Sequence, residues 1–218
     1  RGDVYKRQVV DHMIATALWE ISLLEDQDFD QIKISMKAFD VPTTIEAYQK
    51  LSEMVPYPLH LGITEAGTVQ AGSIRTAVGL GYLLYEGIGD TIRVSLSGDS
   101  KDEVFAGYEI LKSLNLRQKG ATLVACPSCG RADVDVVKLA NDVDSMIRQS
   151  NKNVKVAVMG CEVNGPGEAK DADVGIAAGA GRAIIFRKGE KVRVVPEDEM
   201  LSALMEEINN TQIPEITN

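Results

Sequence analysis

Pro58-Leu-His-Leu-Gly-Ile-Thr64 and Thr91-Ile-Arg-Val-Ser-Leu-Ser97 are the two stretches that decide the fold of the N-terminal half. In each, apolar residues alternate with small or polar ones over seven positions, a pattern typical of a β-strand. Between them, residues 72–85 carry a helical pattern that ends before Gly87 and Gly89. Strand–helix units of this length predict an α/β fold with a parallel sheet and right-handed crossovers.

The same alternation of strand and helix extends to both sides of these stretches. Residues 31–38 (QIKISMKA) are expected to form a further strand, and helices are expected over 9–24, 41–54 and 102–114. Three parallel strands cannot close a barrel. We therefore expect the first domain to be incomplete at its N-terminus, the chain to be a fragment that is inactive alone, and residues 1–8 to be a cloning or assembly scar.

The pattern changes after Gly120, and we expect a domain boundary near residues 115–121. A first domain over 1–117 and a second over 118–218 follow from this boundary. The second domain is expected to contain strands over 122–125 and 154–159, a helix over 134–149, antiparallel strands within 174–195 that turn at Lys188-Gly189, and a helix over 196–209.

Composition limits the classes of partner. The 218 residues carry a formal net charge of −9, which argues against nucleic acid, because phosphate binding needs clustered Lys and Arg. No apolar run approaches the roughly 18 residues of a membrane span. Three cysteines without an export signal indicate a reducing compartment, which we take to be the cytoplasm.

The cysteines have a spacing that suits a metal centre: C-x2-C-x31-C-x6-E, formed by Cys126, Cys129, Cys161 and Glu168. A two-residue gap lets two thiolates converge on one centre from a single turn, and Cys161 also follows a strand. Spacing alone leaves three classes open: an iron–sulfur cluster, a zinc site, or a redox dithiol. A zinc site lacks a nearby fourth ligand, because both histidines lie far upstream.

The residues around the third cysteine narrow the choice. They read Met159-Gly-Cys-Glu-Val-Asn-Gly-Pro-Gly-Glu-Ala169, a loop poor in side chains that lets backbone approach a cluster or an anion closely. This segment and Cys126-Pro-Ser-Cys-Gly-Arg131 are similar to the 4-hydroxy-3-methylbut-2-enyl diphosphate synthase family. Residues 34–38, 58–67 and 87–96 resemble the same family, so the resemblance covers about 9–209.

The resemblance implies a TIM-type barrel followed by a smaller α+β domain that holds a [4Fe–4S] cluster. The chain would then contain the C-terminal part of the barrel, with strands ending in Lys37, Glu65 and Ser95, and the whole cluster domain. Our strand pattern places Lys37 and Glu65 at strand ends independently of the family, and catalytic residues of such barrels lie there.

The resemblance also implies roles for particular residues. Glu65 would act as an acid or base, or orient a substrate hydroxyl. Lys37 and Arg93 would neutralise diphosphate oxygens, Ser95 and Asn164 would add hydrogen bonds, and His60 would be a core residue nearby. The cluster ligands would be Cys126, Cys129, Cys161 and Glu168, the last with a surface carboxylate as its alternative role.

The implied reaction is reductive ring opening and dehydroxylation of 2-C-methyl-D-erythritol 2,4-cyclodiphosphate to (E)-4-hydroxy-3-methylbut-2-enyl diphosphate, in the non-mevalonate isoprenoid pathway. The implied partners are a flavodoxin or ferredoxin as electron donor and a second copy in a homodimer. Two alternatives remain at this point: another iron–sulfur or zinc enzyme, or a non-catalytic electron-transfer module with the same cysteine spacing.

Overall fold

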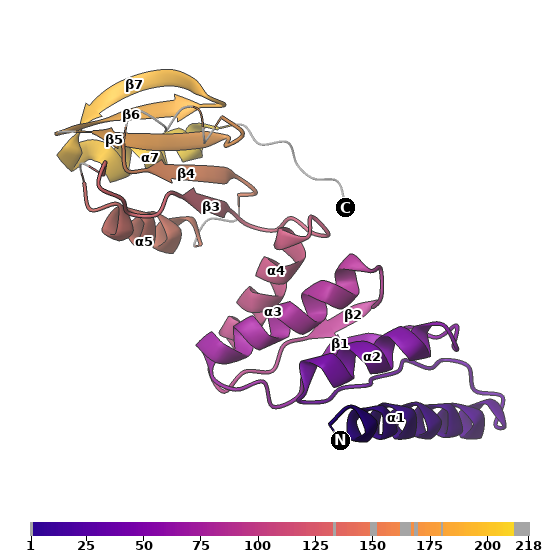
Figure 1. The fold of residues 1–218 in the computed structure, drawn as a ribbon. Helices are drawn as coiled ribbons and strands as arrows, with labels where there is room; N and C mark the ends of the chain where they lie inside the picture. The colour runs from indigo at the N-terminus through magenta and orange to yellow at the C-terminus, as the bar shows by residue number, and fades with distance from the viewer. Residues whose placement is uncertain are drawn as a thin grey trace. The chain divides into compact units, whose positions relative to one another are not determined.

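The computed structural model describes residues 2–132, 134–148, 152–161, 167, 170–179 and 181–211, with side chains from Arg7 onward. The chain divides into two compact units, Arg1–Gln118 and Lys119–Asn218. Figure 1 labels the helices and strands of both units. Each unit is an α/β structure with its own apolar core.

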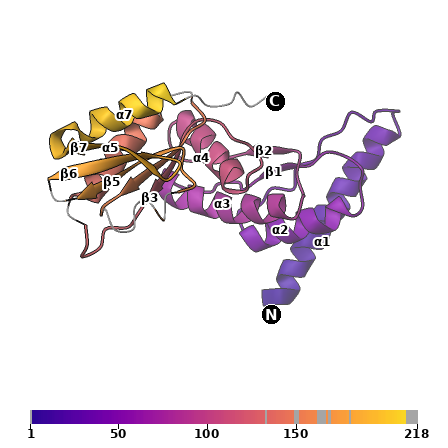
Figure 2. The same cartoon turned by 90° about the horizontal axis from the view of Figure 1, so that it is seen from above.

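The first unit consists of helices around a small parallel sheet. Its two strands pair in parallel with His60 opposite Thr91, and Ile34 adds a parallel bridge to Leu59 on the other side of the first strand. The long helix α1 packs against α2, as Figure 2 shows. The elements in chain order are α1 (Gly2–Glu25), α2 (Val41–Ser52), β1 (His60–Gly62), α3 (Val69–Tyr85), β2 (Thr91–Arg93) and α4 (Ser100–Ser113).

Local sequence explains where these helices begin and end. The carboxylate of Asp40 accepts the N–H of Thr43 at 3.0 Å and caps α2, with a proline in its first turn. Asp99 caps α4 in the same way through the N–H of Lys101. Helix α3 ends before Gly87, whose φ of 78° is readily adopted by glycine alone.

Three predicted elements of this unit differ from the structure. Helix α1 begins at Gly2 and not at Val9, because Lys, Arg and Gln are good helix formers even where an apolar stripe is weak. The expected strand over 31–38 is reduced to the bridge at Ile34. The expected strand over 91–97 stops at Arg93, although Ser97 bridges Thr68 farther on.

The second unit contains one five-stranded sheet in the order β3-β4-β5-β6-β7. β3, β4 and β5 run parallel, whereas β5, β6 and β7 are antiparallel. The elements are β3 (Thr122–Ala125), α5 (Val136–Ile147), β4 (Lys155–Met159), β5 (Val174–Gly179), β6 (Arg182–Arg187), β7 (Glu190–Pro196), the 3-10 turn η1 (Glu197–Glu199) and α7 (Met200–Asn210).

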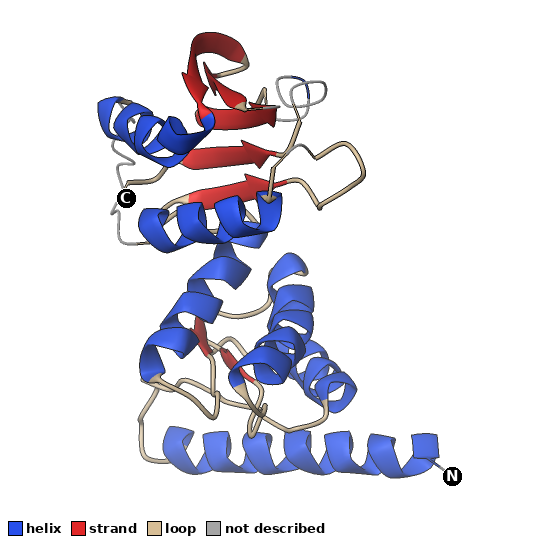
Figure 3. Cartoon of the chain, turned by 90° about the vertical axis from the view of Figure 1, so that its left-hand side faces the viewer, coloured by secondary structure: helices blue, strands red, loops and turns tan. Residues whose placement is uncertain are grey.

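Helices α5 and α7 cover the same face of this sheet, as Figure 3 shows. Buried residues of both helices meet alternate strand residues such as Val156, Ile176 and Ile185. On the opposite face Phe186 lies over Gly175, where an added Cβ would stand 2.1 Å from the ring. A glycine is therefore required there for the aromatic ring to pack.

The hairpin between β6 and β7 turns at Lys188 and Gly189, with φ of 47° and 80°. Two positive φ values are the signature of the hairpin turns that match strand twist, and the predicted antiparallel strands and their turn are confirmed. Within the described residues, no helix is long and apolar enough to cross a membrane.

Candidate functional site

The sheet of the first unit has one apolar and one polar face. Leu59, Leu61 and Ile63 are buried in the core. His60 alternates with them and is therefore on the opposite face, where its Nδ1 lies 2.7 Å from Oγ1 of Thr91 on the neighbouring strand. His60 is half-buried here and is not the core residue that the sequence suggested.

Three cations lie around this histidine. Burial lowers the pKa of His60, and the positive charges of Lys37, Lys33 and Arg93 lower it further. Burial also lowers the pKa of Lys37, followed by the charges of Arg93 and Lys33. The three positive charges are thus concentrated in the same small region, which favours the binding of an anion with several negative oxygens. We call Lys33, Lys37, Arg93 and His60 the cationic cluster.

Lys37 reaches this region across a glycine. A Cβ on Gly62 would stand 2.9 Å from Cδ of Lys37 and 3.1 Å from the carbonyl oxygen of Arg93. Gly62 is also the partner of Arg93 in the β1–β2 register. The missing side chain at residue 62 therefore leaves room for the aliphatic stem of Lys37 beside Arg93.

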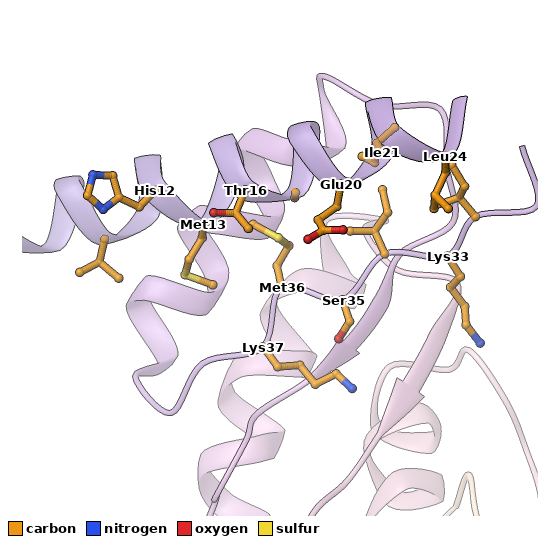
Figure 4. A pocket seen from close by; sticks show the side chains of 14 residues that line it. His12, Met13, Thr16, Glu20, Ile21, Leu24, Lys33, Ser35, Met36 and Lys37 are labelled. Atoms are coloured by element: carbon orange, nitrogen blue, oxygen red, sulfur yellow. The ribbon is translucent and has the colours of Figure 1, made fainter. Parts of the chain in front are cut away.

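A groove of about 610 Å³ lies between α1 and residues 32–37. Its walls are mostly apolar and include Met13 and Ile21 of α1. Figure 4 shows Lys33 and Lys37 extending from the strand segment with their ammonium groups away from α1. The groove borders the polar face without holding the charged ends of these lysines.

The loop after β1 carries Glu65 in a left-handed conformation, with φ of 54°. This conformation is costly for a residue with a Cβ, and such strain is concentrated at functional positions. Arg75 holds the loop in place, because its guanidinium donates to the carbonyl oxygen of Ala66 and stacks 4.8 Å over the ring of Phe39. The Glu65 side chain is exposed.

Ser95 is half-buried two residues beyond the end of β2. The next residue, Leu96, donates its N–H to the carboxylate of Glu103 at 2.8 Å. Since Lys37 and Glu65 also follow bridge or strand residues, the three predicted positions are all on connections after parallel segments. Among the residues predicted to bind substrate, Lys37 and Arg93 lie close enough for the charge of Arg93 to lower the pKa of Lys37.

In the second unit, Cys126 and Cys161 follow neighbouring parallel strands. β3 ends opposite β4, with Ala125 paired to Val158. The N–H of Gly160, the residue before Cys161, donates to Sγ of Cys126 at 3.2 Å. Cys126 and Cys161 are half-buried, Cys129 is exposed, and all three are free thiols.

These donors fit an iron–sulfur cluster in their chemistry. Thiolates are the usual cluster ligands, and a backbone N–H directed at a ligand sulfur is a known means of tuning such a centre. No group of three Cys, His, Asp or Glu side chains in the described part of the chain is close enough together to hold a metal ion. Glu168 and Asn164 lie outside the described residues.

Sequence reasoning missed several residues of the polar face. Lys33 could have been found, because Lys33, Ser35 and Lys37 alternate along one strand segment and so share a face. Thr91 and Gly62 had no comparable signal, since their roles depend on which strands pair. Tyr48, whose hydroxyl bonds to the backbone of Met36 and His60, lies on a helix and resembles an ordinary core residue in the sequence.

The fold and the site define an α/β protein with a cationic face in one unit and free thiols at parallel strand ends in the other. Residues 2–108 match the family profile described as the GcpE TIM-barrel domain, and residues 122–210 match that of the GcpE protein C-terminal domain. The chain belongs to the GcpE family.

Three curated relatives share one name, 4-hydroxy-3-methylbut-2-en-1-yl diphosphate synthase (flavodoxin). The protein from Dehalococcoides mccartyi is 58% identical over 200 residues, which is 92% of this chain and 58% of the relative. The protein from Geobacter sulfurreducens is 54% identical over 204 residues, 94% of this chain and 58% of the relative. The protein from Clostridium acetobutylicum is 49% identical over 206 residues, which is 94% of this chain and 59% of the relative. The chain thus spans less than two thirds of these relatives.

Proposed function

We propose that the chain contributes to reductive ring opening and dehydroxylation of 2-C-methyl-D-erythritol 2,4-cyclodiphosphate, giving (E)-4-hydroxy-3-methylbut-2-enyl diphosphate. The names of the relatives support this reaction. The observation that carries it in the structure is that the stem of Lys37 lies beside Arg93 and over Gly62, on the strand that also carries His60. A diphosphate is the part of this substrate that such a cluster would bind.

In this proposal residues 1–117 are the C-terminal portion of a TIM-type barrel and residues 118–218 are the cluster domain. The profile matches to 2–108 and 122–210 support that division. Parallel strands with helices after each one, as in β1-α3-β2-α4, are the repeating unit of such a barrel.

The cationic cluster would hold the substrate by its diphosphate oxygens. Arg93 offers a planar fork of donors, and the lysines offer point charges that follow the position of the anion. Ser95 and Asn164 would add hydrogen bonds to the substrate. Glu65, held in a strained backbone conformation on the loop after β1, would orient or protonate the hydroxyl that leaves.

Cys126, Cys129 and Cys161 would hold three irons of a [4Fe–4S] cluster, and Glu168 would hold the fourth through oxygen. When bound, this group supplies the electrons and the Lewis acidity that reductive loss of a hydroxyl needs. The contribution of the chain's own residues is geometric. The Gly160 N–H fixes the sulfur of Cys126 beside the end of β4.

The partners proposed are a flavodoxin or ferredoxin as electron donor and a second copy of the chain. The word flavodoxin in the relatives' names supports the donor. A homodimer is supported by an exposed apolar stripe at helical spacing on α3, where Ile74 is 64% exposed, Val78 58% and Tyr85 80%. Exposed apolar patches of this kind mark interaction surfaces.

The proposal is tested by anaerobic reconstitution of the chain with iron and sulfide, followed by iron counting and calorimetric titration with the cyclic diphosphate. We expect about four irons per chain, lost on Cys161→Ser, and substrate binding that weakens roughly tenfold or more on Lys37→Ala. Stoichiometric zinc without colour would exclude the redox chemistry. A loaded chain that binds no cyclic diphosphate would leave only an electron-transfer module.

A further inference from the structure

The parallel ladder between residues 34–38 and β1 contains an inserted side-chain hydroxyl. The N–H of Ile34 donates to the carbonyl oxygen of Pro58 at 2.9 Å, and the N–H of His60 donates to Ile34 at 2.7 Å. In a regular parallel ladder the next bond would run directly from the N–H of Met36 to the carbonyl oxygen of His60.

Tyr48 of α2 occupies that place. The N–H of Met36 donates to Oη of Tyr48 at 2.9 Å, and this hydroxyl donates to the carbonyl oxygen of His60 at 2.5 Å. The ladder resumes beyond the insertion, where the N–H of Thr64 donates to Ala38 at 3.1 Å. The hydroxyl therefore bridges the two segments within the stretch between two places where they are directly bonded.

The bridge is fixed in place by burial. Tyr48 has no exposed surface, and burial raises the pKa of its hydroxyl, so the group stays protonated and able to donate. Both backbone groups that it joins would otherwise lack a partner at this distance, which is costly in a core. The insertion also explains why the predicted strand over 31–38 is reduced to one bridge.

We infer that Tyr48 is a positioning residue for the cationic cluster, because its hydroxyl sets the separation of the segment that carries Lys37 from the strand that carries His60. Met36 immediately precedes Lys37, and the carbonyl oxygen that accepts from Tyr48 belongs to His60 itself. Without the hydroxyl, Met36 and His60 would bond directly and the stem of Lys37 would move relative to Gly62. This inference rests on the proposed binding of a diphosphate by the cluster.

The test uses the 218-residue chain, inorganic pyrophosphate as the ligand, and the Tyr48→Phe variant. We expect pyrophosphate affinity to fall roughly threefold to tenfold, the range of one hydrogen bond, and the 13C shift of the Lys37 ε-carbon to move. Tyr57→Phe is the matched control, because it removes a hydroxyl that donates to Glu25; it should leave both readouts unchanged.

The outcomes separate the two proposals. If the unaltered chain does not bind pyrophosphate, the proposed diphosphate site is wrong. If it binds, and folded Tyr48→Phe binds equally well with an unchanged Lys37 shift, only the role of Tyr48 is wrong. Should Tyr48→Phe fail to fold, amide exchange in the unaltered chain decides. Saturating pyrophosphate should slow exchange at Met36, and an unchanged rate would overturn the inference.

Discussion

The aliphatic stem of Lys37 occupies the space that a side chain on Gly62 would fill, because a Cβ at residue 62 would stand 2.9 Å from Cδ of Lys37. The same Cβ would lie 3.1 Å from the carbonyl oxygen of Arg93. One glycine on β1 thus decides how close two cations of the cluster come to each other. A substitution there tests the cluster without removing any charge.

Gly62→Ala should weaken pyrophosphate binding several-fold, because the added methyl group displaces Lys37 while every charged group is retained. Calorimetric titration measures the change. Gly81→Ala on α3 is the matched control: its Cβ would meet nothing within 4 Å, and alanine favours a helix by roughly 0.5–1 kcal/mol. Equal affinity of the two variants would show that Lys37 does not contact the anion.

Glu65→Gly should stabilise the chain while it removes the carboxylate that is proposed to act as an acid or base. A left-handed conformation costs a residue with a Cβ about 1–2 kcal/mol, and glycine is free of this cost but loses more chain entropy on folding. The net gain in the free energy of unfolding is expected to reach up to about 1 kcal/mol in urea titrations. In the proposed function, the same change made in a chain of the relatives' full length should lower turnover by roughly 100-fold or more.

Glu65→Gln separates these two effects, because it keeps the backbone strain and loses only the carboxylate. It should match the unaltered chain in stability and match Glu65→Gly in turnover. A glutamine variant that turns over at the normal rate would exclude an acid–base role for Glu65. A glycine variant of lower stability would show that the conformation at residue 65 is not strained.

His60 should make the chain less stable as the pH falls. Burial and the neighbouring cations hold its pKa in the folded state below the ordinary value of 6.5. Below that pH the unfolded chain therefore binds a proton that the folded chain resists, and the free energy of unfolding decreases until the folded-state pKa is reached. Above about pH 6.5 this contribution is constant.

The comparison that isolates this effect is urea unfolding of the unaltered chain and of His60→Gln at a series of pH values. As the pH falls below 6.5, the free energy of unfolding of the unaltered chain should decrease relative to that of His60→Gln. The control is His12→Gln, which removes the chain's other histidine. A pH-independent difference for His60→Gln would mean that neither burial nor the cations lower the pKa of this ring in the folded chain.

Much of the fold follows from periodicity alone. Alternation in residues 58–64 and 91–97 locates β1 and β2, and the Lys188-Gly189 turn locates the last hairpin, because each signal is local. Features that depend on a residue far away in the sequence cannot be predicted from such local patterns. The strand expected over 31–38 is interrupted by the hydroxyl of Tyr48, twelve residues away on a helix, which no local pattern records.

The same contrast between local signals and distant partners applies to the candidate site. Lys37 and Arg93 were predicted together, and the structure brings them within electrostatic reach of each other. The role of Gly62 was hidden, because it depends on a side chain from another segment. The ligand roles of Cys126, Cys129, Cys161 and Glu168 stay predictions, since sequence spacing gives the order of donors along the chain and not their convergence in space.

Gly160→Ala should impair the cysteine site through the hydrogen bond to Cys126. An added Cβ would stand 3.2 Å from the Cβ atoms of Ala132 and Val136, closer than most such contacts, so the end of β4 must shift. The N–H that now donates to Sγ of Cys126 at 3.2 Å would move with it. We expect the reconstituted cluster to be lost faster in air and its reduction potential to change, because N–H donors to ligand sulfurs tune such centres.

Gly130→Ala is the matched control for this variant. Gly130 directly follows Cys129 on the same loop, yet a Cβ there would meet nothing within 4 Å. Visible absorption over time and a redox titration of both variants make the comparison. If Gly160→Ala keeps the cluster and its potential as well as Gly130→Ala does, the Gly160 N–H has no role at Cys126. The two strand ends would then be neighbours in the sheet without forming one site.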